Sequence, residues 1–199
     1  EFGFQYIIKA GGNEYQRIGE MASTKASFIL SLNFPQAMDV EDPNDARFVA
    51  LADMKHWEMA PSNPAAFEKA GIPFCLTAAD LRDPKSFYAN LRKAMDHGLT
   101  EGRALEALTQ TPARILGIYD KLGSLETGKL ANFFISSGPV FQEKTMILQN
   151  WVQGIKYGIK EENWSDVKGT YNLTVQSAQG VSTYTLDAKS MTTANVIGK

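Results

Sequence analysis

The sequence predicts an α/β fold with parallel strands up to Gly117 and antiparallel β structure beyond it. Two patterns carry this prediction. Before Gly117, short apolar runs alternate with segments whose apolar residues recur at helical spacing, an order typical of βαβ units. After Gly117, turn residues separate runs in which apolar and polar side chains alternate, as they do in strands with one covered face.

Three apolar runs in the first part are the expected parallel strands, at 4–8, 28–32 and 72–77. The first ends before two consecutive glycines, and an Asn-Phe-Pro sequence at 33–35 stops the second. The third is apolar throughout, which predicts that both of its faces are covered. We expect two of these three strands to be neighbours in one sheet, and a brief further strand at 57–59.

Helices are expected between and after these strands because capping residues, prolines and apolar spacing coincide. Asn, Asp and Thr are favoured just before a first helical turn, proline within it, and glycine after the last turn. Asn13 is an expected N-cap of this kind. The expected helices lie at 13–21, 45–53, 62–70, 83–97, 100–108 and 111–116.

The second part is expected to be β structure throughout. Its first strands are predicted at 132–136, 145–152 and 155–159, with Gly154 in a tight turn. The alternation predicts that four side chains are largely buried in one small sheet, those of Phe133, Ile135, Ile147 and Trp151.

A last stretch, from Trp164 onward, alternates apolar and polar residues in two runs. Tyr171, Leu173 and Val175 share one face of the first run, and Gly180 lies between the two runs, which predicts a hairpin. The changes of pattern divide the chain into three segments, 1–117, 118–160 and 161–199.

Composition and charge exclude several classes of function. The 20 basic and 22 acidic residues give a formal charge of −2, so no basic face for a nucleic acid is indicated. No run approaches the roughly 20 apolar residues that a membrane span needs. The single cysteine, Cys75, excludes a disulfide within the chain and a cysteine-rich zinc site. The two histidines, His56 and His97, are too few for a polyhistidine metal centre.

Both ends of the sequence look internal. It opens with Glu-Phe-Gly-Phe, without Met or a basic leader, and it closes without a helix cap or a turn signal. We therefore expect a fragment of a longer protein, and the alternative is a mature domain after processing. The lack of disulfides does not decide the compartment. The C-terminal β segment looks like a surface appendage, which favours an exported or periplasmic protein.

Three ordered motifs follow the strand at 72–77. Residues 104–117 read A-L-x-x-L-T-x-x-P-A-x-x-L-G, residues 123–133 read G-S-L-E-T-G-K-L-A-N-F, and residues 152–157 read V-Q-G-I-K-Y. They resemble the segment in which metal-dependent amidohydrolases, imidazolonepropionase-like members in particular, leave the barrel and re-enter a small β-sandwich. The resemblance implies a partial (β/α)8 TIM barrel, made of its C-terminal strands, followed by small antiparallel β-sandwich elements. It continues weakly back to Tyr6 and does not cover 164–199.

The resemblance also implies a reaction, the hydrolysis of a carbon–nitrogen bond in a small molecule, a cyclic amide, by a metal-activated water. Family members hold zinc or another divalent metal with histidines at strand ends, and an Asp after the last strand accepts the proton of the water. Asp80 falls at that place, which makes it the candidate catalytic residue and metal ligand. The alternative is that Asp80 caps or borders the next helix.

Other positions that the resemblance assigns to metal ligands carry different residues. Lys9 and Asn33 stand where the family has histidines, and Asn is a poor replacement for imidazole on zinc. A carboxylated lysine lies earlier in the barrel in this superfamily, so Lys9 is interpreted as a plain lysine. His56 is interpreted as an ordinary buried or surface histidine, His97 as a residue at a helix C-terminus, and Cys75 as a core residue.

Two main hypotheses follow. In the first, the chain is part of a metal-dependent hydrolase whose remaining half-barrel, or a partner chain, completes the site. In the second, it is a degenerate, metal-free amidohydrolase-like scaffold or interaction module. A sugar- or peptide-binding module would have to rest on the C-terminal β segment alone. We predict that the 199-residue chain by itself binds no catalytic metal and has no hydrolase activity, because a catalytic zinc needs about three protein ligands.

Overall fold

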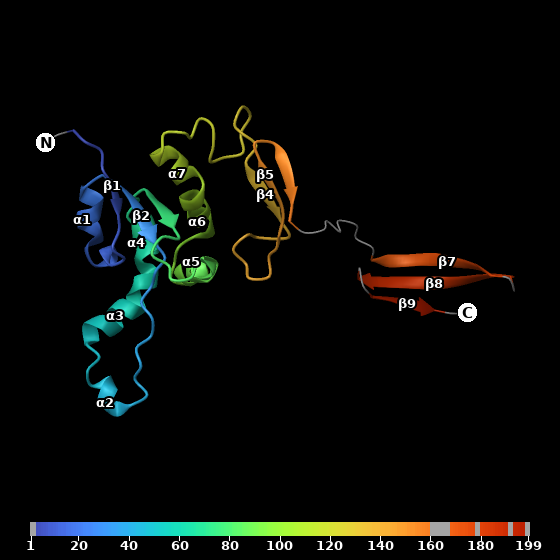
Figure 1. Ribbon diagram of the computed structural model, residues 1–199, viewed down its shortest axis with the longest axis horizontal. Helices are drawn as coiled ribbons and strands as arrows, with labels where there is room; N and C mark the ends of the chain where they lie inside the picture. Colours follow the sequence, from blue (N-terminus) through green and yellow to red (C-terminus); the bar gives the residue numbers. More distant parts are fainter. Residues whose placement is uncertain (1–2, 160–167, 178–179, 191–192, 198–199) are drawn as a thin grey trace. The chain divides into compact units, whose positions relative to one another are not determined.

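The computed structural model describes residues 3–159, 168–177, 180–190 and 193–197. The chain divides into two compact units, Glu1–Ile159 and Lys160–Lys199, whose elements are shown in Figure 1. Within the described ranges, no helix combines the length and the apolar composition that crossing a membrane requires.

A parallel sheet with strand order β1-β2-β3 organises the first unit (Figure 1). Ile8 pairs with Phe28, and Phe28 pairs in turn with Phe74. The predicted parallel strands are therefore confirmed, with all three in one sheet. The cover predicted for the third strand is confirmed too, because Phe74, Cys75 and Leu76 are all buried. The strands are β1 (Ile7–Lys9), β2 (Ser27–Ser31) and β3 (Phe74–Thr77).

Helices and short 3-10 helices connect and follow these strands. Asp42, Asp83 and Thr100 cap α2, η3 and α6 by accepting a hydrogen bond from a backbone N–H two or three residues ahead. Asn13, the expected cap, makes no such side-chain bond before η1. The elements are η1 (Glu14–Arg17), α1 (Ile18–Ser23), α2 (Pro43–Ala46), α3 (Leu51–Met59), η2 (Ala60–Ser62), α4 (Asn63–Lys69), η3 (Pro84–Ser86), α5 (Phe87–Asp96), α6 (Glu101–Leu108) and α7 (Gln110–Ile115).

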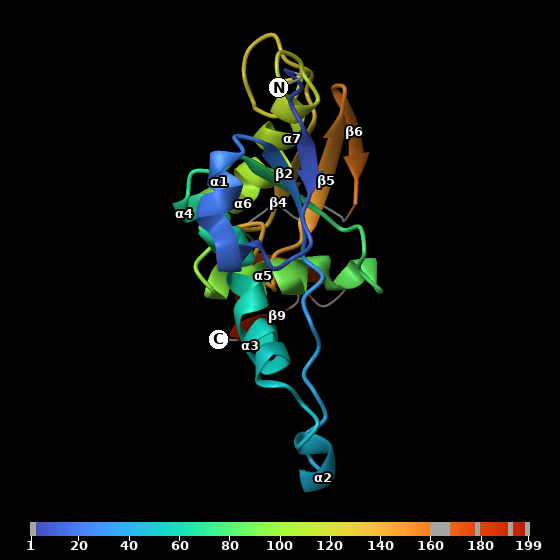
Figure 2. The ribbon, with the colours of Figure 1, turned by 90° about the vertical axis from the view of Figure 1, so that its left-hand side faces the viewer.

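The segment between β2 and β3 differs from its prediction. The expected strand at 57–59 is wrong, since these residues complete α3, and the expected helix at 45–53 is interrupted by the extended backbone of Ala50. Leu51–Met59 contains no β-branched residue, and its Leu, Ala, Met, Lys and Glu favour a helix. Figure 2 shows α2 and α3 extending away from the sheet, and Phe48 between them is 87% exposed.

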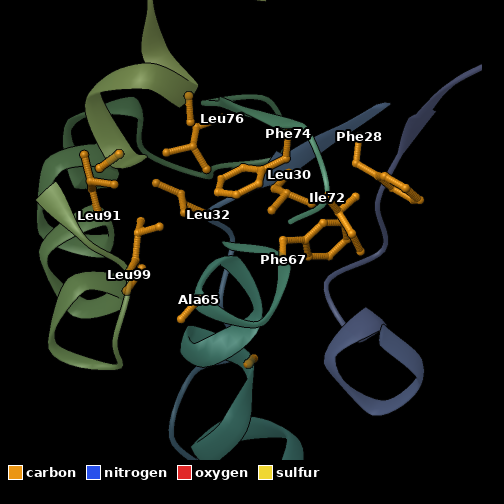
Figure 3. Packing of buried hydrophobic residues seen from close by; sticks show 14 of the residues in the cluster. Phe28, Leu30, Leu32, Ala65, Phe67, Ile72, Phe74, Leu76, Leu91 and Leu99 are labelled. Atoms are coloured by element: carbon orange, nitrogen blue, oxygen red, sulfur yellow. The ribbon is translucent and has the colours of Figure 1, made fainter. Parts of the chain in front are cut away.

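The hydrophobic core lies between the sheet and the helices α4, α5 and α6. Alternate residues of the central strand and its continuation, Phe28, Leu30 and Leu32, are buried on one side of the sheet (Figure 3). Phe67 of α4 packs edge to face on Phe28 and Phe74, with ring centroids 5.0 and 5.9 Å apart. Burying one such side chain contributes about 1.5–3 kcal/mol. The three rings therefore fasten α4 to strands β2 and β3.

A second, antiparallel sheet completes the first unit, with strands β4 (Phe133–Ser136), β5 (Ile147–Val152) and β6 (Ile155–Gly158). The strands agree with the prediction, but the burial does not. Phe133, Ile135, Ile147 and Trp151 are only partly buried, because three short strands leave much of both faces open. Phe133 and Trp151 nevertheless stack, with ring centroids 5.5 Å apart.

The second unit is an antiparallel sheet of β7 (Gly169–Ser177), β8 (Gly180–Ser190) and β9 (Thr193–Ile197). Ser177 pairs with Gly180, which confirms the predicted hairpin, and residues 178–179 lie outside the described ranges. Leu173 lies opposite Tyr184. The expectation for Trp164 also concerns a residue outside the described ranges.

Candidate active site

The carboxyl ends of the parallel strands bring the predicted site residues together. Lys9 is the last residue of β1, Ser31 ends β2 and Thr77 ends β3. Asn33 lies two residues after β2, and Asp80 lies three residues after β3. In barrel-type α/β folds the residues of the active site project from these strand ends.

Lys9 and Asp80 form an ion pair at this end of the sheet. The Lys9 Nζ atom lies 2.9 Å from Asp80 Oδ1 and 2.7 Å from Asp80 Oδ2. The two side chains are 53% and 46% exposed, so the pair contributes only about 0–1 kcal/mol to stability. The sequence treated these two residues separately. Lys9 stands where the resemblance expects a metal-binding histidine, and Asp80 is the candidate catalytic carboxylate.

The turn that carries Asp80 is held from both sides. Asp80 itself has a φ of 71°, a left-handed conformation that Asp adopts more readily than most side chains. The Ser31 hydroxyl donates to the Ala79 carbonyl at 2.7 Å, and the Ala79 N–H donates to Thr77 Oγ1 at 3.1 Å. The cap of the next helical element is Asp83, which accepts from the Lys85 N–H at 2.9 Å, so Asp80 does not serve as that cap.

A cavity of about 200 Å³ opens beside the ends of β1 and β2. The residues that line it include three with polar side chains, Ser31, Asn33 and His56. The complete lining consists of Gly11, Gly12, Ser31, Asn33, Phe34, Pro35, His56, Ala60 and Asn63.

His56 lies on α3 and not at a strand end, and a hydrogen-bond network orients its ring. Tyr15 stacks on the imidazole, with ring centroids 6.0 Å apart, and its hydroxyl lies 3.0 Å from His56 Nδ1. The Tyr15 N–H donates to Asn63 Oδ1 at 2.7 Å, and Asn63 Nδ2 donates to Glu14 Oε2 at 2.8 Å. Glu14 in turn accepts from the Gly12 N–H at 3.1 Å, which ties the network to the loop after β1.

His97 and Cys75 lie where the sequence interpretation put them. His97 follows α5, and its Nδ1 lies 2.7 Å from the Lys93 carbonyl oxygen in the last turn. Cys75 is buried inside β3, and burial raises the pKa of its thiol, which keeps the thiol protonated and unreactive. Neither residue lines the cavity beside β1 and β2.

Comparison with known proteins now decides the family. The model of the amidohydrolase family matches residues 58–184, more than half of the chain. The chain belongs to the amidohydrolase family. The match begins after His56 and continues beyond the three motifs into β8, further than the resemblance predicted.

One curated protein and two solved structures show what this chain is similar to. The imidazolonepropionase of Aeromonas hydrophila is 36% identical over 76 residues, which are 36% of this chain and 18% of that protein. The structure of an amidohydrolase from Thermotoga maritima MSB8 superposes with a TM-score of 0.59 at 25% identity, over 78% of this chain and 37% of that one. A Xaa-Pro dipeptidase with bound methionine gives a TM-score of 0.53 at 19% identity, over 76% and 39%.

These likenesses define the fold class of this amidohydrolase chain. The fold is of the TIM-barrel type, and the sheets that the described residues form are open rather than closed. The chain spans about a fifth of the imidazolonepropionase and less than two fifths of the superposed structures. It is thus a partial amidohydrolase domain.

Amidohydrolases are generally metal-dependent. Whether this chain can bind a metal ion depends on the side-chain atoms at its strand ends. The Lys9 ammonium has no lone pair to offer, and it faces both carboxylate oxygens of Asp80. The resemblance places Asn33 where the family has a histidine, and an amide is a poor zinc ligand. In the described part of the chain no three His, Cys, Asp or Glu side chains form a group that could hold a metal ion. The described residues therefore do not fit a resident zinc.

A larger cavity, of about 470 Å³, lies at the opposite ends of the strands. Ser27 and Pro73, at the amino ends of β2 and β3, line it together with Arg103 and Arg114. In barrel-type folds this end contributes to stability, whereas chemistry is found at the carboxyl ends. We therefore place the candidate site beside Lys9 and Asp80.

Sequence analysis missed the residues that support His56. Tyr15 and Asn63 are 48 positions apart, and Asn63 is 4% exposed at the start of a helix. Its Asn-Pro sequence indicated a helix start, and nothing in that pattern pointed to a buried amide that joins two other segments. The network becomes visible only when the loop after β1 and α4 are brought together.

Proposed function

We propose that this chain is the C-terminal part of a (β/α)8 barrel hydrolase that acts on the carbon–nitrogen bond of a small cyclic amide. The position of Asp80 is the main support for this proposal, because its carboxylate lies in the turn after the last parallel strand. A cavity lies at the same edge of the sheet, beside the ends of β1 and β2. The likeness to an imidazolonepropionase supports the cyclic amide. Residues 118–160 would then contribute to a small β-sandwich, and residues 161–199 would form an additional module.

Asp80 has a definite task in this reaction. Its carboxylate accepts the proton of the water that attacks the amide carbonyl, and it returns that proton to the leaving nitrogen. The ammonium of Lys9, 2.7 Å away, holds the carboxylate toward the carboxyl end of β1, across the central strand β2. A divalent metal bound by other parts of the protein, or by a partner chain, would supply an activated water.

The test uses the full-length parent protein with hydantoin as the cyclic amide and ring opening as the readout. Asp80→Asn is expected to lower the rate by about 100-fold or more, because general base catalysis contributes at least that factor. Asp83→Asn is the matched control, since asparagine can still cap the helical turn that Asp83 caps. Equal rates for wild type and Asp80→Asn would contradict the proposal.

The Lys9–Asp80 pair also favours a second candidate function, a metal-free amidohydrolase-like module. The Lys9 ammonium neutralises the carboxylate that the family resemblance makes a metal ligand. Zinc added to the 199-residue chain is then expected to show no binding by calorimetry. Micromolar or tighter binding that is lost in Asp80→Asn would contradict this candidate, and stoichiometric zinc in the purified parent would favour the hydrolase.

The compartment and partners are further proposals. We propose that the parent is exported or periplasmic, which periplasmic fractionation of expressing cells would test. The proposed partners are a small-molecule substrate and the remaining half of the barrel or a partner chain.

A further inference from the structure

We infer that the cavity of about 200 Å³ binds the amide ring of the substrate, with His56 and Asn33 as the hydrogen-bonding residues. This inference rests on the proposed function, because it names how that site would recognise a cyclic amide. His56 belongs to α3, outside the strand ends from which the family resemblance draws its site residues.

The first observation is that the His56 ring is held in one orientation. Tyr15 both stacks on it and contacts Nδ1, with an angle of 10° between the ring planes. Tyr15 is held by the buried Asn63, and Asn63 by Glu14. The side-chain amide of Asn63 is buried, so breaking its hydrogen bonds would leave a buried polar group without a partner, which is costly. The network therefore keeps Tyr15, and with it the His56 ring, in one orientation.

The second observation is that two residues lining the cavity carry polar side-chain groups without partners among the described residues. Tyr15 contacts Nδ1 of His56, which leaves Nε2 as the ring nitrogen that can bind a ligand. No described residue forms a hydrogen bond with His56 Nε2 or with the side-chain amide of Asn33. The Ser31 hydroxyl, by contrast, already donates a hydrogen bond to the Ala79 carbonyl.

The chemistry of these groups matches an amide. A neutral imidazole nitrogen offers either a donor or an acceptor, and an Asn side chain offers both. A cyclic amide presents a carbonyl oxygen and an N–H side by side, which this pair of residues can satisfy together. The volume of about 200 Å³ lies below the range of drug-sized pockets, roughly 300–1,000 Å³, and favours a single small ring.

The experiment titrates hydantoin into the 199-residue chain and follows the imidazole signals by NMR. The chain has two histidines, so His97 at the end of α5 is an internal control. We expect the His56 signals to shift and saturate at millimolar hydantoin while the His97 signals stay in place. 1,3-Dimethylhydantoin, which lacks the N–H donors, should bind about tenfold more weakly, as the loss of one buried hydrogen bond predicts.

Variants separate recognition from folding and from catalysis. Asn33→Leu is expected to weaken hydantoin binding about tenfold, measured on the His56 signals, whereas His97→Gln leaves it unchanged. Asp80→Asn should bind hydantoin as the wild type does, because Asp80 does not line the cavity. Unmoved His56 signals, or equal shifts of both histidines, would overturn the inference. Asp80-dependent hydrolysis in the parent could still stand in that case, so the two failures are distinguishable.

Discussion

The two units of the chain contain strands with apolar side chains on one face that are covered very differently. In the parallel sheet, Phe28 and Leu30 of β2 are each 1% exposed. In the C-terminal sheet, Leu173 and Val175 of β7 are 39% and 42% exposed, although their ladder is longer and regular. Strand formation thus follows local sequence, whereas burial requires a second layer, which α4, α5 and α6 provide in the first unit.

The largest expected effect is in the covered sheet. Phe67→Ala removes the ring that packs between Phe28 and Phe74, and it should lower the free energy of unfolding of the first unit by about 3–5 kcal/mol. Urea unfolding followed by circular dichroism would measure this. Phe48→Ala is the matched control, since Phe48 is 87% exposed, and it should change stability by about 0.5 kcal/mol or less. Similar losses of unfolding free energy in Phe67→Ala and Phe48→Ala would contradict the conclusion that burial of the parallel sheet stabilises the first unit.

The next effect tests how tightly the connector after α7 packs. Gly123 has a φ of 96°, and an added Cβ would lie 2.8 Å from Ala113 Cβ and 3.1 Å from the Thr109 carbonyl oxygen. Gly123→Ala should therefore cost about 1–3 kcal/mol in the same unfolding experiment. Gly128→Ala shares the positive φ, 92°, but has open space around its Cβ, so it isolates the backbone strain from the steric clash. Equal losses in the two variants would show that the clash is relieved.

The elements that sequence analysis predicted correctly share strong local signals. The strands at 28–32 and 72–77 are apolar runs between turn residues, and Thr100 precedes its helix as a cap should. The strand expected at 57–59 is wrong because the helix formers around Trp57 outweigh the strand preference of its aromatic side chain. Burial in the β4–β6 sheet was overestimated because alternation identifies a face without showing what covers it.

The candidate site was predictable only in part. The end of β3 and the turn after it placed Asp80 from the sequence, because parallel strands align their carboxyl ends. The partner of Asp80 is 71 residues away in sequence, and no spacing rule joins Lys9 to it. The orientation of His56 depends on contacts with Tyr15 and through it with Asn63, which arise only from tertiary packing.

A smaller effect is expected at the start of α6. The Thr100 hydroxyl accepts from the Arg103 N–H at 3.2 Å and donates to Glu68 Oε1 at 2.6 Å. Thr100→Ala removes both bonds and should lower the unfolding free energy by about 1 kcal/mol, whereas Thr100→Ser keeps the hydroxyl and should retain most of it. Thermal unfolding of the two variants side by side measures the difference. A serine variant as unstable as the alanine variant would argue against the capping role.

The smallest effect is expected in the β7–β9 sheet. Its size shows whether the exposed face of that sheet is also uncovered in solution. Leu173 is 39% exposed and directly opposes Tyr184, which is 36% exposed. Cross-strand pairs of this kind contribute about 0.2–1 kcal/mol, so Leu173→Ala should reduce the protection of the β7–β9 amides against hydrogen exchange by no more than that. A loss of several kcal/mol would instead mean that another layer covers this face. Repeating the exchange at higher protein concentration would then identify a second copy of the chain as that layer, because protection by a partner copy rises with concentration.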